Sequence, residues 1–257
     1  MHFLKSILRR PDEEAAPKAV VRKESRRAQR YAISPNFPLK AVLCFSGRDG
    51  MGTPLSGSRV GWDLKGRLVD FSELGARLQL GPAALGTSGD FCELRLSLGG
   101  IVLEVPCHVT NVRVESEGLH YGLKLDFTDV AKLKAYRQLL DIVALGARLK
   151  LHFKKPKPDD SGYLVEQYAS DRQSRLTVWR DSSDRTVSAF EFLLRDCLVR
   201  AAQGQRIEYL SGTDTAEARK ATPAKSTEIQ RLFQWVVPNL APAVPADVRA
   251  FLQAYAD

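Results

Sequence analysis

Residues 66–80 read G-R-L-V-D-F-S-E-L-G-A-R-L-Q-L. Apolar and polar side chains alternate before and after the central segment Ser72–Gly75, which predicts two strands joined by a turn. The turn carries the pattern D-x-S-x-x-G, formed by Asp70, Ser72 and Gly75. The segments on both sides of this hairpin follow the same strand pattern.

Further short strands are expected, separated by glycine-rich or polar turns. They span Phe37–Phe45, Phe91–Leu96, Ile101–Thr110 and Leu119–Phe127. Strands of this length and spacing predict an antiparallel barrel or sandwich. Asp129–Leu145 then changes to a helical period, with Asp129 or Thr128 as the N-cap. A mainly β barrel followed by a closing helix accounts for a first domain over residues 25–150.

Composition divides the rest of the chain. Residues 1–24 hold many charges and few large apolar groups, so we expect a mobile basic arm. Residues 151–163 contain two prolines and no apolar period, which predicts a linker. Residues 164–257 predict a smaller α+β domain of unknown role. Its expected elements are strands at Ser174–Trp179 and Arg206–Leu210 and terminal helices at Thr227–Val237 and Ala246–Tyr255.

Residues 187–201 fit two periods. Val187, Phe190 and Leu194 belong to a helical stripe, and Ser188 with Glu191 resembles a capping box. The alternation of Phe190, Phe192 and Leu194 fits a strand equally. We expect a helix here. For Trp179, at the end of the preceding strand, we expect a place in the core rather than on a partner surface.

A net charge of +8 over 257 residues favours acidic partners, namely nucleotides, nucleic acid or an anionic membrane, although a basic surface without a partner fits equally. The cysteines, Cys44, Cys92, Cys107 and Cys197, form no C-x-x-C pair and are expected as buried thiols in a reducing compartment. The four histidines are scattered, so no metal site is expected. The sequence has no signal peptide and no run of about 18 apolar residues, which predicts a cytoplasmic protein without a transmembrane segment.

Three arginines stand at the start of the first domain, where residues 26–30 read R-R-A-Q-R. Arg26 and Arg30 form the pattern R-x-x-x-R, which is common by chance in a basic chain, so a solvated arm is one interpretation. The other interpretation is a ligand clamp, because the planar guanidinium fork meets phosphate oxygens or guanine O6 and N7 with two hydrogen bonds. Arginines on a mobile arm would fold over a ligand as it binds.

The D-x-S-x-x-G pattern is more specific and also has two interpretations. In the first, Asp70 and Ser72 bond their own backbone and Gly75 supplies a positive φ, as in any tight turn. In the second, Asp70 accepts hydrogen bonds from a guanine edge and Ser72 bonds a phosphate or base. Gly75 then lets the next strand pass close to the ligand.

The arginine pattern, the D-x-S-x-x-G turn, the antiparallel strands and the closing helix together resemble the PilZ domain, over roughly residues 20–150. Tyr121-Gly122-Leu123 is similar to the end of that family's last strand. The resemblance implies a six-stranded antiparallel barrel that binds the bacterial second messenger cyclic di-GMP. It further implies a ligand site made of Arg26, Arg27, Arg30, Asp70, Ser72 and Gly75.

The leading hypothesis is therefore a non-enzymatic cyclic di-GMP receptor, in which binding rearranges the N-terminal arm or the second domain and signals to a protein partner. The alternative is a basic nucleic-acid-binding regulator that uses the barrel without the messenger. No helix-turn-helix, RNA-binding motif or stripe of interleaved aromatic and basic residues supports that alternative. No phosphate loop, metal cluster or nucleophile–base constellation indicates an enzyme, and no catalytic residue is assigned.

Overall fold

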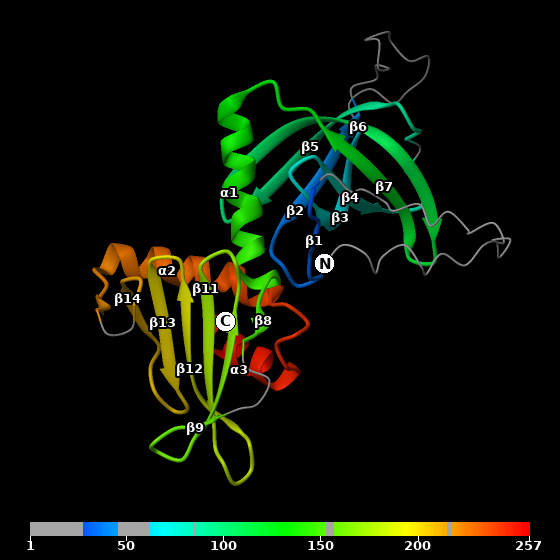
Figure 1. Ribbon diagram of the computed structural model, residues 1–257. Helices are drawn as coiled ribbons and strands as arrows, with labels where there is room; N and C mark the ends of the chain where they lie inside the picture. Colours follow the sequence, from blue (N-terminus) through cyan, green and yellow to red (C-terminus); the bar gives the residue numbers. More distant parts are fainter. Residues whose placement is uncertain (1–27, 46–61, 85, 153–156, 215–216) are drawn as a thin grey trace, which may run out of the picture.

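The computed structural model describes residues 28–45, 62–84, 86–152, 157–214 and 217–257 (Figure 1). The first part of the chain forms an antiparallel sheet in the order β1-β3-β2-β5-β6-β7-β4. β3 also pairs with β4, and this pairing closes β2–β7 into a six-stranded barrel, as predicted. The strands are β1 (Tyr31–Ala32), β2 (Lys40–Phe45), β3 (Asp63–Phe71), β4 (Gly75–Leu80), β5 (Phe91–Leu98), β6 (Ile101–Glu115) and β7 (Gly118–Leu125).

The barrel interior is filled by the alternate apolar side chains of these strands. In β4, for example, Ala76, Leu78 and Leu80 are buried, and in β5 Leu94, Leu96 and Leu98 are buried. The residues between them face outward, because successive side chains of a strand point to opposite faces. This alternation places the polar side chains of β4, β6 and β7 on one outer surface of the barrel.

The helix α1 (Val130–Ala147) follows the barrel, and Asp129 is its N-cap, accepting from the backbone N–H groups of Ala131 and Lys132. Its buried Tyr136 packs against Phe71 and Phe127 and donates a hydrogen bond of 2.8 Å to the carbonyl of Ser72. The first half of α1 is therefore anchored on the turn between β3 and β4. The predicted helix at Asp129–Leu145 is confirmed.

The second part of the chain is an antiparallel sheet with α2 (Pro223–Val236) and α3 (Ala246–Ala256), joined by the short helix η1 (Val237–Asn239). Phe190 and Phe192 of the sheet contact Phe233 of α2, so the helices cover one face. We call this α+β unit the second module. Its strands are β8 (Lys150–Leu151), β9 (Lys157–Pro158), β10 (Leu164–Ala169), β11 (Ser174–Arg180), β12 (Val187–Leu194), β13 (Cys197–Ala202), β14 (Glu208–Ser211) and β15 (Arg219–Lys220).

The prediction of a helix over residues 187–201 is wrong, because this segment forms the hairpin of β12 and β13. Ser188 and Glu191 are strand residues and make no capping box. Phe190, Phe192 and Leu194 point to the covered face, where α2 buries their side chains. Helical and strand periods both fit so short a stretch, and the apolar surface of α2 favours the strand.

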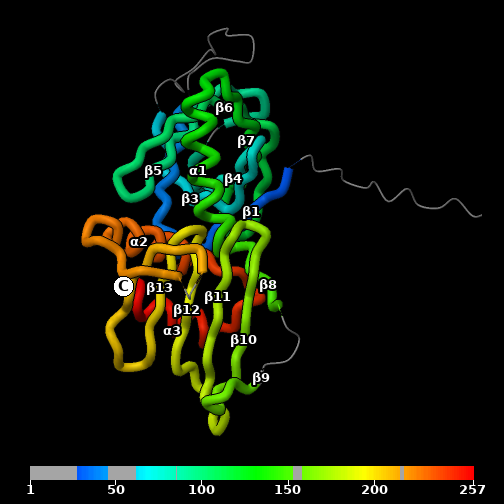
Figure 2. Tube along the Cα trace, turned by 60° about the vertical axis from the view of Figure 1, so that its left-hand side comes forward, coloured from blue at the N-terminus to red at the C-terminus, as the bar shows by residue number. Residues whose placement is uncertain are grey.

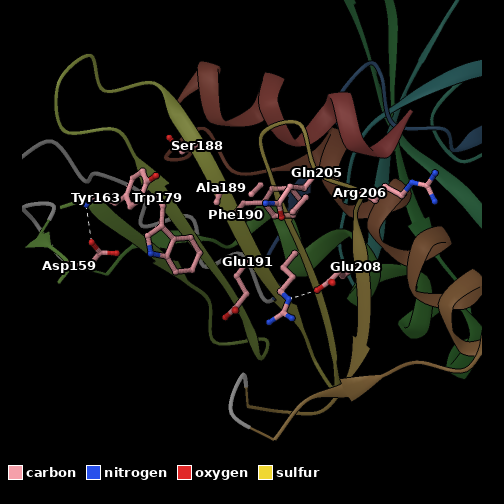
Figure 3. A pocket seen from close by; sticks show the side chains of 13 residues that line it. Asp159, Tyr163, Trp179, Ser188, Ala189, Phe190, Glu191, Gln205, Arg206 and Glu208 are labelled. Atoms are coloured by element: carbon pink, nitrogen blue, oxygen red, sulfur yellow. Dashed lines mark hydrogen bonds and ion pairs between the residues drawn. The ribbon is translucent and has the colours of Figure 1, made fainter. Parts of the chain in front are cut away.

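The other face of the second sheet is open, and Trp179 lies on it rather than in the core (Figure 3). Trp179 pairs with Ala189, which in turn pairs with Ala202, so two small side chains lie beside the indole. They leave a shallow hollow of about 580 Å³, bordered also by Tyr163 and Arg206. The sequence expectation of a buried Trp179 is therefore corrected.

The helix α1 belongs to both parts of the molecule, and Figures 1 and 2 show it running from the barrel to the second module. Leu140 and Val143 join the core of the barrel, whereas Leu145 joins the core of the second module. Trp235 of α2 packs against the tip of the β5–β6 hairpin, where a Cβ on Gly99 would clash with the indole. The two parts thus meet along a continuous packed junction.

Three of the four cysteines, Cys92, Cys107 and Cys197, are buried, Cys44 is half-buried, and all four are free thiols. Burial raises the pKa of the Cys107 thiol to about 12, which keeps it neutral. In the described ranges, no three His, Cys, Asp or Glu side chains come together as a metal cluster. No helix within those ranges is long and apolar enough to span a bilayer.

Candidate functional site

Asp70 is the charged centre of the candidate site. It is the second-last residue of β3, and its side chain turns away from the barrel core toward two guanidinium groups. Its Oδ1 lies 2.6 Å from Nη1 of Arg30 and its Oδ2 lies 2.8 Å from Nε of Arg77. Asp70 is only 8% exposed, so its charge is balanced by these two arginines rather than by water.

Arg30 reaches Asp70 because β1 pairs with the end of β3, with Ala32 opposite Asp70 and Tyr31 opposite Phe71. The first part of the R-x-x-x-R pattern, including Arg26 and Arg27, lies outside the described residues. The structure thus joins one arginine of that pattern to the aspartate of the D-x-S-x-x-G pattern, 40 residues further along the chain. Both motifs contribute to one place on the barrel surface.

Ser72 is used by the turn itself. It is buried, its backbone N–H donates to the carbonyl of Gly75 at 2.8 Å, and its hydroxyl donates to the same oxygen at 3.3 Å. Its own carbonyl accepts from Tyr136. Of the backbone-bonded turn considered from the sequence, the structure therefore has the part played by Ser72, whereas Asp70 pairs with two arginines instead of bonding its own backbone.

In one interpretation of the sequence, Gly75 has a positive φ. Its φ is not positive, so the glycine has another role. A Cβ at Gly75 would lie 2.5 Å from the carbonyl oxygen of Leu123 on β7 and 3.8 Å from Nη2 of Arg30. The glycine is needed because β7 passes so close to β4.

A cavity of about 400 Å³ opens beside Asp70 on the outer face of the barrel. We call it the barrel cavity. Its lining holds three guanidinium groups and one carboxylate, which makes it suited to an anion. The residues that line it are Arg30, Asp70, Arg77, Asn111, Arg113, His120 and Gly122.

Four of these residues were not identified from the sequence: Arg77, Asn111, Arg113 and His120. Strand register brings them together, since Arg113 is opposite His120 on β7 and Asn111 is opposite Gly122. A bulge between Val109 and Asn111 shifts the register of β6, and a Cβ on Gly122 would meet the Asn111 side chain at 2.5 Å. Of these four, Arg77 could have been found from the sequence. It follows Gly75 by two residues, and the strand alternation already implies that its side chain faces outward.

His120 is the most buried polar side chain of the barrel cavity, with 5% of its surface exposed. Neither ring nitrogen has a hydrogen-bond partner among the described residues, although Nε2 lies 3.4 Å from a carboxylate oxygen of Glu115. Arg113 is exposed and has no ion pair in the described ranges. The cavity therefore contains donors that the protein leaves available to a ligand.

Comparison with known proteins agrees with this arrangement. The family model described as the PilZ domain matches residues 22–145, which include β1 through most of α1 and every residue of the barrel cavity. No curated protein matches the chain. The match ends within α1, so all strands and helices of the second module lie beyond it.

Proposed function

Since residues 22–145 match the PilZ domain family, which in general consists of cyclic di-GMP receptors, we propose that this protein binds cyclic di-GMP in the barrel cavity and transmits the binding event to a protein partner. The observation that carries the proposal is the ion pair of Arg30 with Asp70 at the edge of an arginine-lined cavity. It joins the two sequence motifs in a site with the charge that a dinucleotide needs.

The chemistry of the ligand fits the residues of the cavity. Cyclic di-GMP carries two phosphate charges and two guanines. In the proposal, Arg30 together with Arg26 and Arg27 holds phosphate and guanine, since guanidinium groups pair with phosphate oxygens and with guanine O6 and N7. Asp70 accepts hydrogen bonds from the guanine edge. Ser72 bonds a phosphate or base, or supports the turn, and Gly75 provides the close approach.

A ligand that engages Arg30 competes with Asp70 for its guanidinium. Arg77 stays on the other oxygen of Asp70, so the carboxylate keeps one partner when Arg30 leaves. This matters because an unpaired buried carboxylate is costly. The exchange is thus a means by which binding moves the arm.

The neighbours of Arg30 contact the second module. Arg148 donates to the Gln29 side chain at 2.6 Å and to the Tyr31 hydroxyl at 3.3 Å, and Arg172 donates to the same hydroxyl at 3.3 Å. Arg30 therefore stands between two residues held at the junction. Any shift of β1 on ligand binding changes those contacts, and in our proposal this is how the arm or the second module is repositioned.

We also propose that the protein is cytoplasmic. The four free thiols support a reducing compartment, where disulfides are rare. In this proposal the protein is a receptor without enzymatic activity, as PilZ domains generally are.

Calorimetric titration with cyclic di-GMP tests the proposal. We expect wild-type protein to bind, and Arg30→Ala, Arg26→Ala and Ser72→Ala each to weaken binding about ten- to a hundredfold, the cost of one lost charged or buried contact. Arg95→Ala is the matched control, because Arg95 is a barrel arginine paired with Glu104 and does not line the cavity. Its affinity should equal that of the wild type.

The absence of binding heat at high micromolar cyclic di-GMP would overturn the proposal. Gel shifts at physiological salt then examine the nucleic-acid alternative, which requires binding that falls steeply as salt is raised. Circular dichroism of Ser72→Ala is needed beside its titration, because the Ser72 hydroxyl is bonded within the turn.

A further inference from the structure

A second cavity, of about 340 Å³, lies at the junction of the barrel and the second module. We call it the junction cavity. One wall is the segment from Gln29 to Ser34, and the other is formed by the end of α1, the connection from η1 to α3, and α3 itself. Arg30 lines both the junction cavity and the barrel cavity, so the two are neighbours across one side chain.

The junction cavity is cationic. Its lining includes the guanidinium groups of Arg30, Arg148 and Arg249 and no carboxylate side chain. Arg148 is engaged by Gln29, Tyr31 and Asp171. Arg249 is exposed on α3 and pairs with no carboxylate in the ranges that the structure describes. One guanidinium group at this cavity is therefore free to meet an anion.

Asn239 provides an independent observation. Its side chain lines the junction cavity and is 4% exposed. Its Oδ1 accepts from the backbone N–H of Ser34 at 2.8 Å, which fixes the amide so that Nδ2 is the remaining donor. Nδ2 has no hydrogen-bond partner among the described residues. A buried donor without a partner is uncommon in folded proteins and is readily satisfied by a bound acceptor.

We propose that the junction cavity is a phosphate subsite that extends the cyclic di-GMP site into the second module, with Arg249 and Asn239 as its ligand contacts. This inference rests on the proposed function and adds to it a contribution from residues outside the PilZ domain. Arg30 lines both cavities and would contact the parts of the ligand that lie in each of them. A molecule bound across the wall contacts both parts of the protein, so binding strengthens their docking.

The test compares Arg249→Ala with Arg206→Ala by calorimetric titration with cyclic di-GMP. Both variants remove one exposed positive charge from the second module, but Arg206 borders the hollow on the open sheet face (Figure 3) and does not line the junction cavity. We expect Arg249→Ala to weaken binding about five- to thirtyfold, as for loss of one charge-assisted contact. Arg206→Ala should change it by less than about twofold, because an exposed charge outside the site acts only through screened, long-range attraction.

Asn239→Asp is the second variant. It keeps the acceptor for Ser34 and replaces the free donor with a negative charge, so it should weaken cyclic di-GMP binding at least as much as Arg249→Ala. A parallel titration with inorganic phosphate separates a general anion site from a subsite of the dinucleotide. If Arg249→Ala weakens only inorganic phosphate, the subsite proposal is wrong.

The outcomes separate this inference from the proposed function. Wild-type binding that depends on Arg30 but not on Arg249 or Asn239 leaves the receptor function standing and overturns the junction subsite. Equal losses in Arg249→Ala and Arg206→Ala would show a net-charge effect and also overturn it. If the wild-type protein does not bind cyclic di-GMP, both the receptor function and the junction subsite are overturned.

Discussion

At the residue scale, Asp70 shows why the site needs more than the two sequence motifs. A carboxylate this buried requires compensation, and Arg30 and Arg77 each take one of its oxygens. With a single partner, a ligand that drew the arginine away would leave the charge unpaired. With two, the exchange of Arg30 from Asp70 to phosphate that we propose would keep one ion pair throughout.

Gly75 offers a test of the backbone geometry that supports the site. In Gly75→Ala, the added Cβ would lie 2.5 Å from the Leu123 carbonyl, and neither strand of the closed barrel can move away easily. We expect a loss of about 1–3 kcal/mol in the free energy of unfolding, the usual cost of overpacking. Urea unfolding monitored by circular dichroism measures it.

Gly81→Ala is the matched control for this variant. Gly81 follows β4, no atom lies within 4 Å of a Cβ built there, and its φ is not positive. Its unfolding free energy should stay near the wild-type value or rise slightly, because alanine restricts the unfolded chain. Equal stability of the two variants would show that β4 and β7 can separate at Gly75.

The sequence predicted the motif residues of the site but only part of its lining. Arg30 and Asp70 were predicted because each belongs to a short pattern. Arg113 and His120 lie in no pattern and meet only through the register of β6 and β7. That register depends on a bulge near Thr110. A bulge of one residue hardly changes the alternation of apolar residues, so it could not be predicted from the sequence.

At the element scale, β12 shows where the spacing of apolar residues no longer distinguishes a strand from a helix. Its inward side chains, Phe190, Phe192 and Leu194, are apolar, but Val187 and Leu198 extend the run so that a helix fits too. The outcome depends on Phe233, about 40 residues later in the chain, which stacks on Phe190. The barrel was easier to predict because glycine turns separate strands with clean alternation.

A charged contact fixes α3 to the second sheet. Arg180 of β11 is buried, its Nε lies 3.0 Å from Glu166 of β10, and its Nη1 bonds Asp247 in the first turn of α3. The hydrogen bond from Arg180 holds the pKa of Asp247 below its usual range. A carboxyl group with a lowered folded-state pKa stabilises the fold above its unfolded pKa, near 4.

Asp247→Asn should therefore be less stable than the wild type at neutral pH. The difference should shrink as pH falls below about 4 and through the lower folded-state pKa, because the wild-type carboxyl then becomes protonated too. Thermal unfolding between pH 7 and pH 2.5 measures the two curves. Asp160→Asn is the control, since Asp160 has no ion pair in the described ranges, and a pH-independent difference for Asp247→Asn would contradict this account.

At the scale of the whole molecule, the junction connects the candidate site to the second module in two ways. One is apolar, through α1 and the contact of Trp235 with the β5–β6 hairpin. The other is polar and involves the residues beside Arg30, namely Gln29 and Tyr31, held by Arg148 and Arg172. The polar part holds Gln29 and Tyr31, the two chain neighbours of Arg30, so we expect the coupling between the two parts of the molecule to depend on it.

Arg148→Ala tests that division. The variant loses the bonds to Gln29 and Tyr31 and the ion pair with Asp171, while the apolar contacts of α1 and Trp235 remain. We expect the two parts to dock more loosely, seen as a larger radius of gyration by small-angle scattering. Because linkage is reciprocal, cyclic di-GMP that bridges the junction should bind this variant more weakly and, at saturation, restore the wild-type scattering curve. Arg206→Ala, on the open sheet face, should match the wild type in both measurements. If Arg148→Ala left scattering and affinity unchanged, the apolar packing alone would hold the junction, and movement of β1 would have no route to the second module through Arg148.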